Sequence, residues 1–138
     1  MKRLIVGVCL TLLVSTTAWA KDATKVQVDE LSKGSVSWNG DELPAYPEGT
    51  PEITILRITI PPGTTLPMHN HPVINAGVLL SGQLTVITES NQVLHLKADE
   101  SLIEVVGTWH YGKNEGDTPA EIIVFYAGAK DTPITVKK

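Results

Sequence analysis

Short apolar runs, separated by turn residues at intervals of roughly ten positions, fill the chain from residue 53 onward. Many are rich in β-branched residues or alternate apolar with polar positions, which is typical of β-strands. The pattern predicts strands over 53–60, 76–80, 83–88, 93–98, 101–106 and 120–128, an extended segment restarting at 109–111, and one edge strand in the tail. Helical periodicity is missing throughout, so the sequence predicts an all-β sandwich or barrel.

The first twenty residues have the pattern of a secretory signal peptide. Lys2 and Arg3 form a positive start, and residues 4–14 are largely apolar. The segment Ala18-Trp19-Ala20 places small residues at the two positions that a signal peptidase reads. The apolar run is shorter than the roughly 20 residues that a membrane-spanning helix needs. We therefore expect cleavage after Ala20 and export, which in a bacterium means the periplasm.

The remaining 118 residues suit one domain with one core. We expect an N-terminal arm and a Pro/Gly-rich lead-in over 21–52, followed by a barrel over 53–138. The only cysteine, Cys9, lies in the expected signal peptide, so core packing has to hold the mature fold without disulfides.

Charge and hydropathy exclude two classes of partner. The net charge of −4 becomes −6 without Lys2 and Arg3, and the charges are scattered, so no basic patch points to nucleic acid or anionic lipid. After signal cleavage no further apolar stretch is long enough to cross a membrane.

Three histidines form a candidate metal site. His69 and His71 are two residues apart, so on a strand their side chains point to the same face. His110 lies about forty residues later, and a sheet that closes on itself can bring it beside the pair. Three neutral imidazoles suit zinc, iron, nickel or copper and leave positions open for water or substrate. The pair alone is weak evidence, because such pairs also occur in surface loops. His95 alternates with leucines and is expected in solvent or a polar contact.

The spacing around these histidines resembles the two motifs of the cupin superfamily. The segment "GTTLPMHNHPVINAGVLLSG" is similar to the first motif, and "DESLIEVVGTWHYGKN" is similar to the second. The positions that match are Gly63, His69, His71, Gly82, Gly107, His110 and Asn114. The resemblance implies a double-stranded β-helix, the jelly-roll barrel, with the three histidines as ligands of one divalent metal ion.

This sequence departs from that pattern at several positions, and it has a carboxylate at an unexpected place. Asn75 stands where the family has its ligating glutamate, and Asp99 and Val105 replace a motif glycine and proline. We expect Asn75 to orient the ligands rather than bind the ion, although a ligating or purely structural amide stays open. Glu104 interrupts an apolar run, where a carboxylate is costly unless it is paired or metal-bound. It either replaces the missing ligand or acts as general base, unless that strand face is exposed to solvent.

Other side chains have less specific interpretations. Trp109 and Tyr111 should point away from the ligand face and pack at the core or rim. Trp38, Tyr46 and Met68 are candidates for the mouth of the pocket. Arg57 either meets an anionic substrate or, as exposed arginines usually do, lies on a solvated outer face.

The fold alone does not settle the reaction. We expect an exported metal-binding cupin, and a metal-dependent oxidoreductase of dioxygenase type acting on a small molecule. Glu104 or Asn75 would then orient or deprotonate the substrate. The ion would be iron, manganese, zinc, nickel or copper. The alternatives are a non-catalytic metal- or small-molecule-binding cupin and a purely structural ion. The resemblance also implies a homodimer.

Overall fold

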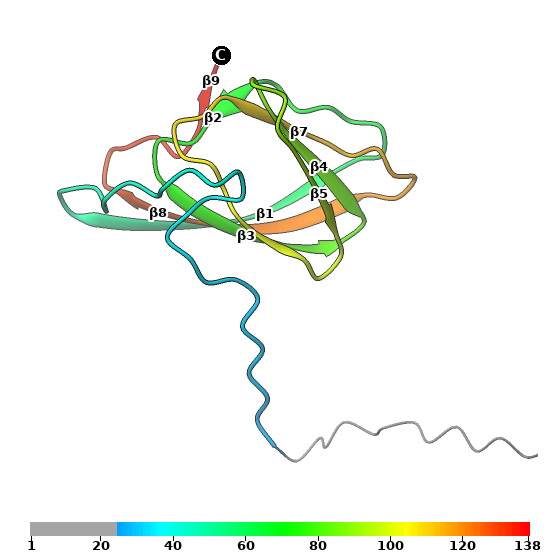
Figure 1. The fold of residues 1–138 in the computed structure, drawn as a ribbon, viewed down its shortest axis with the longest axis horizontal. Coiled ribbons are helices and arrows are strands. Elements are labelled where there is room, and N and C mark those ends of the chain that lie inside the picture. The colour runs from blue at the N-terminus through cyan, green and yellow to red at the C-terminus, as the bar shows by residue number, and fades with distance from the viewer. Residues whose placement is uncertain (1–24) are drawn as a thin grey trace, which may run out of the picture.

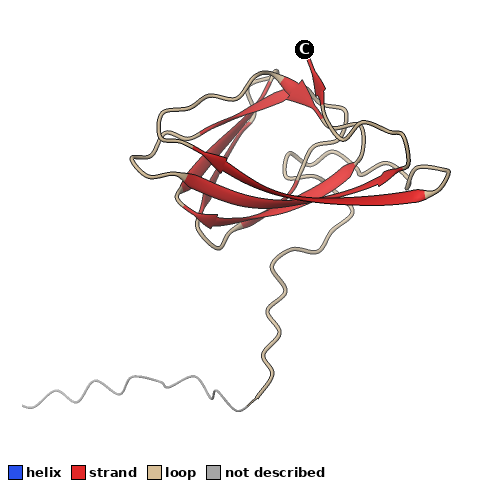
Figure 2. Ribbon diagram, turned by 180° about the vertical axis from the view of Figure 1, so that it is seen from behind, coloured by secondary structure: helices blue, strands red, loops and turns tan. Residues whose placement is uncertain are grey.

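The computed structural model describes residues 25–138, so the expected signal peptide lies outside the described residues. Within this range the regular structure is entirely β, and no helix is present that could span a membrane. The strands are β1 (Pro51–Ile60), β2 (His69–Asn70), β3 (Ile74–Ser81), β4 (Gln83–Thr88), β5 (Val93–Lys97), β6 (Ser101–Ile103), β7 (His110–Lys113), β8 (Ala120–Ala129) and β9 (Val136–Lys137). Figures 1 and 2 show them as two sheets that enclose the interior of a barrel.

The order of strands in the two sheets is that of a jelly roll. One sheet has the order β1-β8-β3-β6, and the other has the order β5-β4-β7-β2-β9. All the pairings between these strands are antiparallel, and the longest joins β1 to β8 over ten residues. The all-β barrel predicted from the sequence is therefore confirmed.

Side chains of β8 alternate between the interior and the outer surface over most of its length. Residues Ala120, Ile122, Val124 and Tyr126 are buried, while Phe125 is exposed. The core cluster joins Ile122, Val124 and Tyr126 to residues from both sheets, among them Leu79, Leu84 and Leu102. Inward positions on a strand are two residues apart, so β8 presents a continuous apolar row to the core.

The observed strands differ from the predicted ones chiefly near the site. The predicted strand over 101–106 ends at Ile103, although the Glu104 amide still donates to the Asn75 carbonyl at 3.0 Å. The edge strand predicted for the tail is present as β9, whereas its partner β2 was not among the predicted strands. Each is only two residues long, and such short strands carry almost no periodic signal in the sequence.

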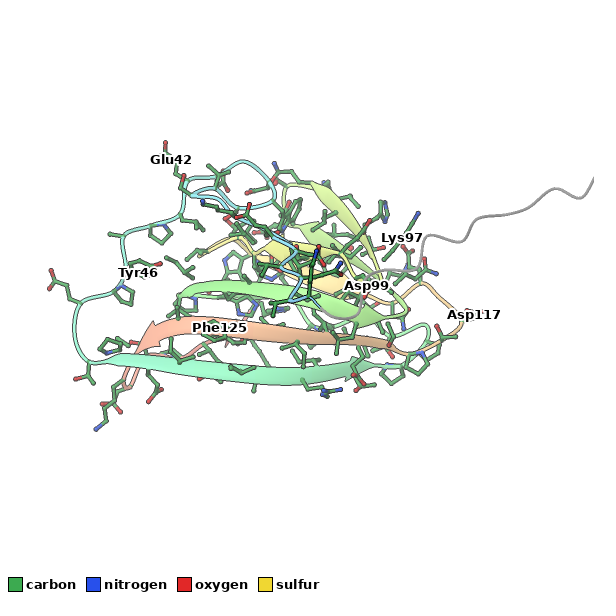
Figure 3. The ribbon with its side chains drawn as sticks, turned by 90° about the horizontal axis from the view of Figure 1, so that it is seen from below. Glu42, Tyr46, Lys97, Asp99, Asp117 and Phe125 are labelled. Atoms are coloured by element: carbon green, nitrogen blue, oxygen red, sulfur yellow. The ribbon has the colours of Figure 1, made fainter. Side chains whose placement is uncertain are left out.

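Two motif positions are explained by backbone conformation. Gly82, in the tight turn between β3 and β4, has a φ of 74°, and Asp99 has a φ of 69° where the family pattern has glycine. Aspartate tolerates this left-handed region better than most residues, so Asp99 (Figure 3) keeps the turn without a glycine.

The motif asparagine, Asn114, is completely buried and joins three segments of the fold. Its side-chain amide donates to the carbonyls of Ile60 at 2.9 Å and Thr118 at 2.8 Å. Its carbonyl oxygen accepts from the amide of Gly116 at 3.0 Å. Asn114 therefore holds the loop after β7 against the end of β1.

The lead-in forms a small turn that rests on β6. Val36 and Glu42 make an isolated bridge, and the Trp38 amide donates to the Ile103 carbonyl at 2.9 Å. Further out, Val26 and Val28 are 94% and 88% exposed, and this part of the arm leads away from the barrel (Figure 1).

The turn at Gly82 gives a prediction about stability. An added Cβ would lie 2.5 Å from the Pro119 carbonyl oxygen, whereas at Gly63, with a φ of 70°, it would meet nothing within 4 Å. We expect Gly63→Ala to cost about 1–2 kcal/mol for the left-handed conformation alone. Gly82→Ala should cost about 2–5 kcal/mol, because the clash adds to that strain. Urea unfolding of both variants checks this, and equal losses would contradict it.

Candidate metal centre

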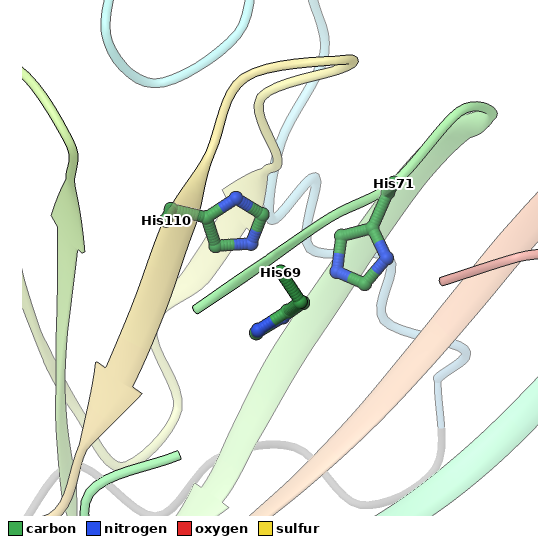
Figure 4. Close-up of side chains that lie close together, drawn as sticks. All are labelled: His69, His71 and His110. Carbon is green, nitrogen blue, oxygen red and sulfur yellow. The ribbon is translucent and has the colours of Figure 1, made fainter. Parts of the chain in front are cut away.

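Three histidines converge on one point inside the barrel. His69 and His110 are direct partners in the pairing of β2 with β7, and His71 follows one residue after β2. Their ring centroids are 4.5–5.1 Å apart. One ring nitrogen from each lies within 4.8 Å of the others, and Figure 4 shows the three rings facing a common space. His71 and His110 are buried, and His69 is half-buried.

Backbone carbonyls fix the orientation and tautomer of each ring. The Nδ1 atoms of His69, His71 and His110 lie 2.7–2.8 Å from the carbonyl oxygens of Pro67, Ile134 and Thr108. A carbonyl can only accept, so each Nδ1 must carry the hydrogen and donate it. Each Nε2 is then left with a lone pair.

This donor set fits a divalent transition-metal ion. Neutral imidazoles whose other nitrogen donates to a carbonyl are the usual arrangement of histidine ligands, because that hydrogen bond holds the ring and raises its basicity. The three histidines could therefore hold one ion.

Burial keeps the rings of His69 and His71 in the form that binds metal. Desolvation lowers the pKa of His71 from 6.5 to about 4 against the opposing effect of its hydrogen bond to Ile134. Desolvation also lowers the pKa of His69, with His110 contributing in the same direction. Both rings are thus neutral at physiological pH.

Glu104 lies beside the histidines and is buried at 8% exposure. Its Oε1 atom accepts from Trp38 Nε1 at 2.8 Å and from the Val105 amide at 2.9 Å. Its Oε2 atom lies 3.9 Å from His110 Nε2. The group of ligand atoms within 4.8 Å of one another comprises the three histidines alone among the described residues. Glu104 is thus a neighbour of the cluster on its His110 side, and the alternative of a solvent-exposed strand face is wrong.

Asn75 and Tyr126 complete the polar surroundings. They are cross-strand partners on β3 and β8, and both are buried. The Asn75 amide donates to the Val73 carbonyl at 3.3 Å. The Tyr126 ring packs edge-on against His71 with centroids 5.3 Å apart. Burial, and secondarily the charge of Glu104, raises the pKa of Tyr126 to about 12, so its hydroxyl stays protonated.

A cavity of about 240 Å³ extends from the histidines into the barrel. This lies just below the roughly 300–1,000 Å³ typical of sites for drug-sized ligands. Its lining includes all five residues predicted from the sequence, namely His69, His71, Asn75, Glu104 and His110. The exposed lining residues mark its mouth, and these are Leu56, Pro67, Thr135 and Lys137.

The residues that we predicted from the sequence for the mouth of the cavity differ from the observed ones, and that prediction is wrong. Trp38, Tyr46 and Met68 do not line this cavity. Trp38 reaches the site from outside through Glu104. Tyr46 is 78% exposed on the loop before β1 (Figure 3).

Three further side chains lie away from the cavity, as expected. His95 is exposed, with its Nδ1 atom 3.1 Å from Thr85 Oγ1. Arg57 forms an exposed ion pair with Glu121. Trp109 packs at the rim, where the Lys138 ammonium lies 5.7 Å from its ring.

Sequence reasoning missed the contributions of β8 and the C-terminal tail. Tyr126 occupies an inward position of β8, but the strand is an almost continuous apolar run in the sequence, so no pattern there showed which side chains point inward. The tail supplies the Ile134 carbonyl for His71, and Lys137 at the mouth pairs with His69. No local pattern indicated these contacts, because they join segments more than sixty residues apart.

Comparison with protein families identifies the fold. Residues 56–126, more than half of the chain, match the cupin domain family. The chain belongs to the cupin family. Comparison of this cupin with curated protein sequences finds no match.

Solved structures of enzymes share the fold. An oxalate oxidase in complex with the substrate analogue glycolate is 27% identical, with a TM-score of 0.52 over 62% of this chain and 45% of that one. The DMSP lyase DddQ from Ruegeria pomeroyi is 18% identical, with a TM-score of 0.55 over 75% and 48%. The Bacillus subtilis oxalate decarboxylase, which has Mn(II) centres, is 22% identical, with a TM-score of 0.52 over 62% and 23%. The matched region of this cupin thus spans less than half of each of these chains.

The lowered pKa of His71 predicts how the stability of the metal-free cupin depends on pH. The folded state disfavours protonation, so below pH 6.5 the unfolded chain binds more protons and stability falls. We expect full stability above pH 6.5 and a progressive loss of about 3 kcal/mol toward pH 4. Urea unfolding across this range measures the loss.

Two variants separate this effect from general acid sensitivity. His71→Asn should flatten the dependence on pH, whereas His95→Asn, at an exposed histidine, should preserve it. An unchanged slope in His71→Asn would show that another group is responsible.

Proposed function

We propose that this cupin is a metal-dependent enzyme in which His69, His71 and His110 hold one divalent ion and Glu104 is the general base. The observation that carries the proposal is the position of Glu104. One of its oxygens is held by two hydrogen bonds, and the other lies 3.9 Å from His110 Nε2 at the cavity wall. Burying a carboxylate is costly, so such a fixed one favours a chemical role.

The ion would supply Lewis acidity and open positions for an anionic ligand beside O₂. Because imidazole binds a metal as a neutral ligand, and the family's carboxylate ligand is replaced by Asn75, the ion would keep its full double positive charge. The Mn(II) centres of the Bacillus subtilis oxalate decarboxylase favour manganese as the first ion to test, with iron, zinc, nickel and copper next.

Glu104 is suited to accept a proton from the bound molecule. Its Oε2 atom is left free by the pair of hydrogen bonds on Oε1, so it can take a proton from an acidic O–H or C–H group in the cavity. Its absence from the ligand group favours this role over that of a fourth ligand. An oxidoreductase of dioxygenase type on a small molecule is the reaction class that we propose.

Tyr126 would orient the substrate, and Asn75 would support the wall beside it. The Tyr126 hydroxyl stays protonated, so it can donate a hydrogen bond to an anionic oxygen of the substrate. Asn75 is its neighbour on the adjacent strand, and the Asn75 amide donates to the Val73 carbonyl. We assign Asn75 to holding the wall and the ligand shell rather than to binding the ion.

The second candidate is a cupin that binds metal or a small molecule without turnover. Asn75 is the observation in its favour, because the carboxylate that the family motif has at this position is missing. The two proposals differ in whether Glu104 changes a reaction rate or only the surroundings of the ion.

The metal proposal is tested by elemental analysis of the purified protein. We expect about one divalent ion per chain, and loss of that ion in the double variant His69→Ala/His71→Ala, since a centre left with one imidazole binds weakly. Purified protein without stoichiometric metal, together with an unchanged melting temperature in the double variant, would sink the metal site.

The role of Glu104 is tested by oxygen uptake of the metal-loaded protein with small carbonyl and phenolic compounds. We expect Glu104→Gln to keep the ion but lose about 10²–10⁴-fold in rate, because the amide cannot accept the proton. Glu115→Gln, at an exposed carboxylate paired with Lys113, is the matched control and should stay active. Equal rates in both variants would remove Glu104 from the mechanism, and no turnover with any compound would favour the binding function.

Export and dimerisation stay predictions, and we propose both. The outer face of the four-stranded sheet favours a homodimer, because it exposes the cross-strand pair Ile55 and Phe125 at 59% and 44% (Figure 3). Sedimentation velocity should give the mass of a dimer for the parent protein and of a monomer for Ile55→Glu. A parent protein that is monomeric would contradict the dimer.

Export is tested by N-terminal sequencing of protein made with its own leader, which should begin at Lys21. A chain that is not cleaved would contradict export.

A further inference from the structure

The interior of the barrel changes from polar to apolar along the direction of the strands. On β8 the cavity-lining residues are Tyr126, Val124 and Ile122, in order of distance from the histidine end. Successive inward positions on a strand are about 6.6 Å apart. Tyr126 packs against His71, so Val124 and Ile122 lie one and two steps away from the ligand cluster.

The opposite sheet repeats this order. His110 on β7 pairs with Thr88 on β4, and the next inward pair along the same two strands is Gly112 with Val86. Both Gly112 and Val86 line the cavity. The two sheets therefore share a polar layer, at the level of the histidines, and an apolar layer directly next to it.

Every hydrogen-bonding side chain of the cavity belongs to the polar layer or to its mouth. These are the three histidines, Asn75, Glu104, Tyr126 and the mouth residues Thr135 and Lys137. Thr135 Oγ1 lies 3.2 Å from His71 Nδ1, which places it at the same end. The apolar layer consists chiefly of Ile58, Leu66, Val86, Leu102, Ile122 and Val124.

The apolar layer is close-packed at its wall and hollow inside. A Cβ atom added at Gly112 would lie 3.3 Å from Leu66 Cδ1 and 3.4 Å from Leu84 Cδ1, so these leucines pack directly against β7 at the glycine. The cavity that these residues line remains beside them. Void beside the polar layer is costly unless a ligand fills it, because its lining loses dispersion contacts.

The charges of the cavity point to a single anionic group on the ligand. Among the described residues, Glu104 and Lys137 are the only lining side chains with a full charge, and they have opposite signs. Their charges cancel, so the charge of a divalent ion would remain to attract the ligand. The described residues place no arginine or lysine in the apolar layer, so nothing there would balance a second carboxylate.

We propose that this cavity binds a small amphipathic monoanion. An oxygen-chelating head, such as a 2-oxo carboxylate, lies in the polar layer, and an aliphatic body of a few carbons fills the apolar layer. The inference rests on the proposed metal site and adds the class of ligand to it. A compact dianion without an apolar part would occupy the polar layer and leave the rest of the cavity empty.

The test is a homologous series of 2-oxo acids titrated calorimetrically into the Mn²⁺-loaded protein. The series runs from pyruvate through 2-oxobutanoate and 2-oxopentanoate to 2-oxohexanoate, so the chelating head stays constant and only the chain grows. We expect the Kd to fall about fourfold for each added methylene until the apolar layer is full.

Variants on β8 locate the site of this gain. Val124→Phe fills the apolar layer and should abolish the dependence of the Kd on chain length. Val124→Thr keeps the volume but adds a hydroxyl, and it should weaken the binding of 2-oxohexanoate severalfold more than that of pyruvate. Ile123→Phe, at the neighbouring outward position, should behave like the parent protein. Metal content is measured for each variant.

The outcomes separate this proposal from the proposed function. A metal-loaded parent protein whose Kd does not change along the series, or a Val124→Phe variant that keeps the full gain, would overturn the amphipathic ligand and leave the metal site standing. A parent protein that takes up no stoichiometric Mn²⁺ and binds no member of the series would overturn both.

Discussion

The hydrogen bonds from histidine Nδ1 atoms to backbone carbonyls are the constraint on which the site depends. His69 and His110 donate to the carbonyls two residues earlier in the chain, whereas His71 donates to Ile134 in the C-terminal tail. The first two contacts are local, so the chain on either side of each histidine sets the ring. The third requires β9 to be in place beside β2. The jelly roll therefore has to close completely before all three lone pairs face the same point.

The same dependence on distant segments applies to Glu104. A buried carboxylate is tolerated when hydrogen bonds satisfy it, and here the partners are the neighbouring Val105 amide and the indole of Trp38. Trp38 lies outside the region that matches the family, on the lead-in turn. The Ser37 hydroxyl adds a hydrogen bond of 2.9 Å to the Glu104 carbonyl. The lead-in thus acts on the site, although it adds no strand to the barrel.

The sequence contained enough information for the barrel and the three histidines, but not for their surroundings. Apolar runs rich in β-branched residues, bounded by turn residues, located β1, β4 and β8, because these features depend on the local sequence whatever the partner strand is. Glu104 was noticeable as a charge in an apolar run. Its burial could not be inferred, since the strand ends at Ile103 and the lead-in covers the next residue. The positions of Tyr126 and Lys137 at the site could not be predicted either, because they depend on which strands become neighbours in space.

The position of the carboxylate has a consequence for the chemistry that the site can support. A glutamate at position 75 would face the ion from β3, and as a ligand it would give up both its charge and its basicity to the metal. Here the amide of Asn75 takes that place, and the carboxylate lies on the adjacent segment, joined to it by the hydrogen bond from the Glu104 amide to the Asn75 carbonyl. The ion would then keep its charge for an anionic ligand, while Glu104 Oε2 stays free to accept a proton. In the proposed function the charge of the ion and the basicity of the carboxylate would thus stay available separately, and this separation is our reason for proposing proton abstraction from a metal-bound anion over a purely structural ion.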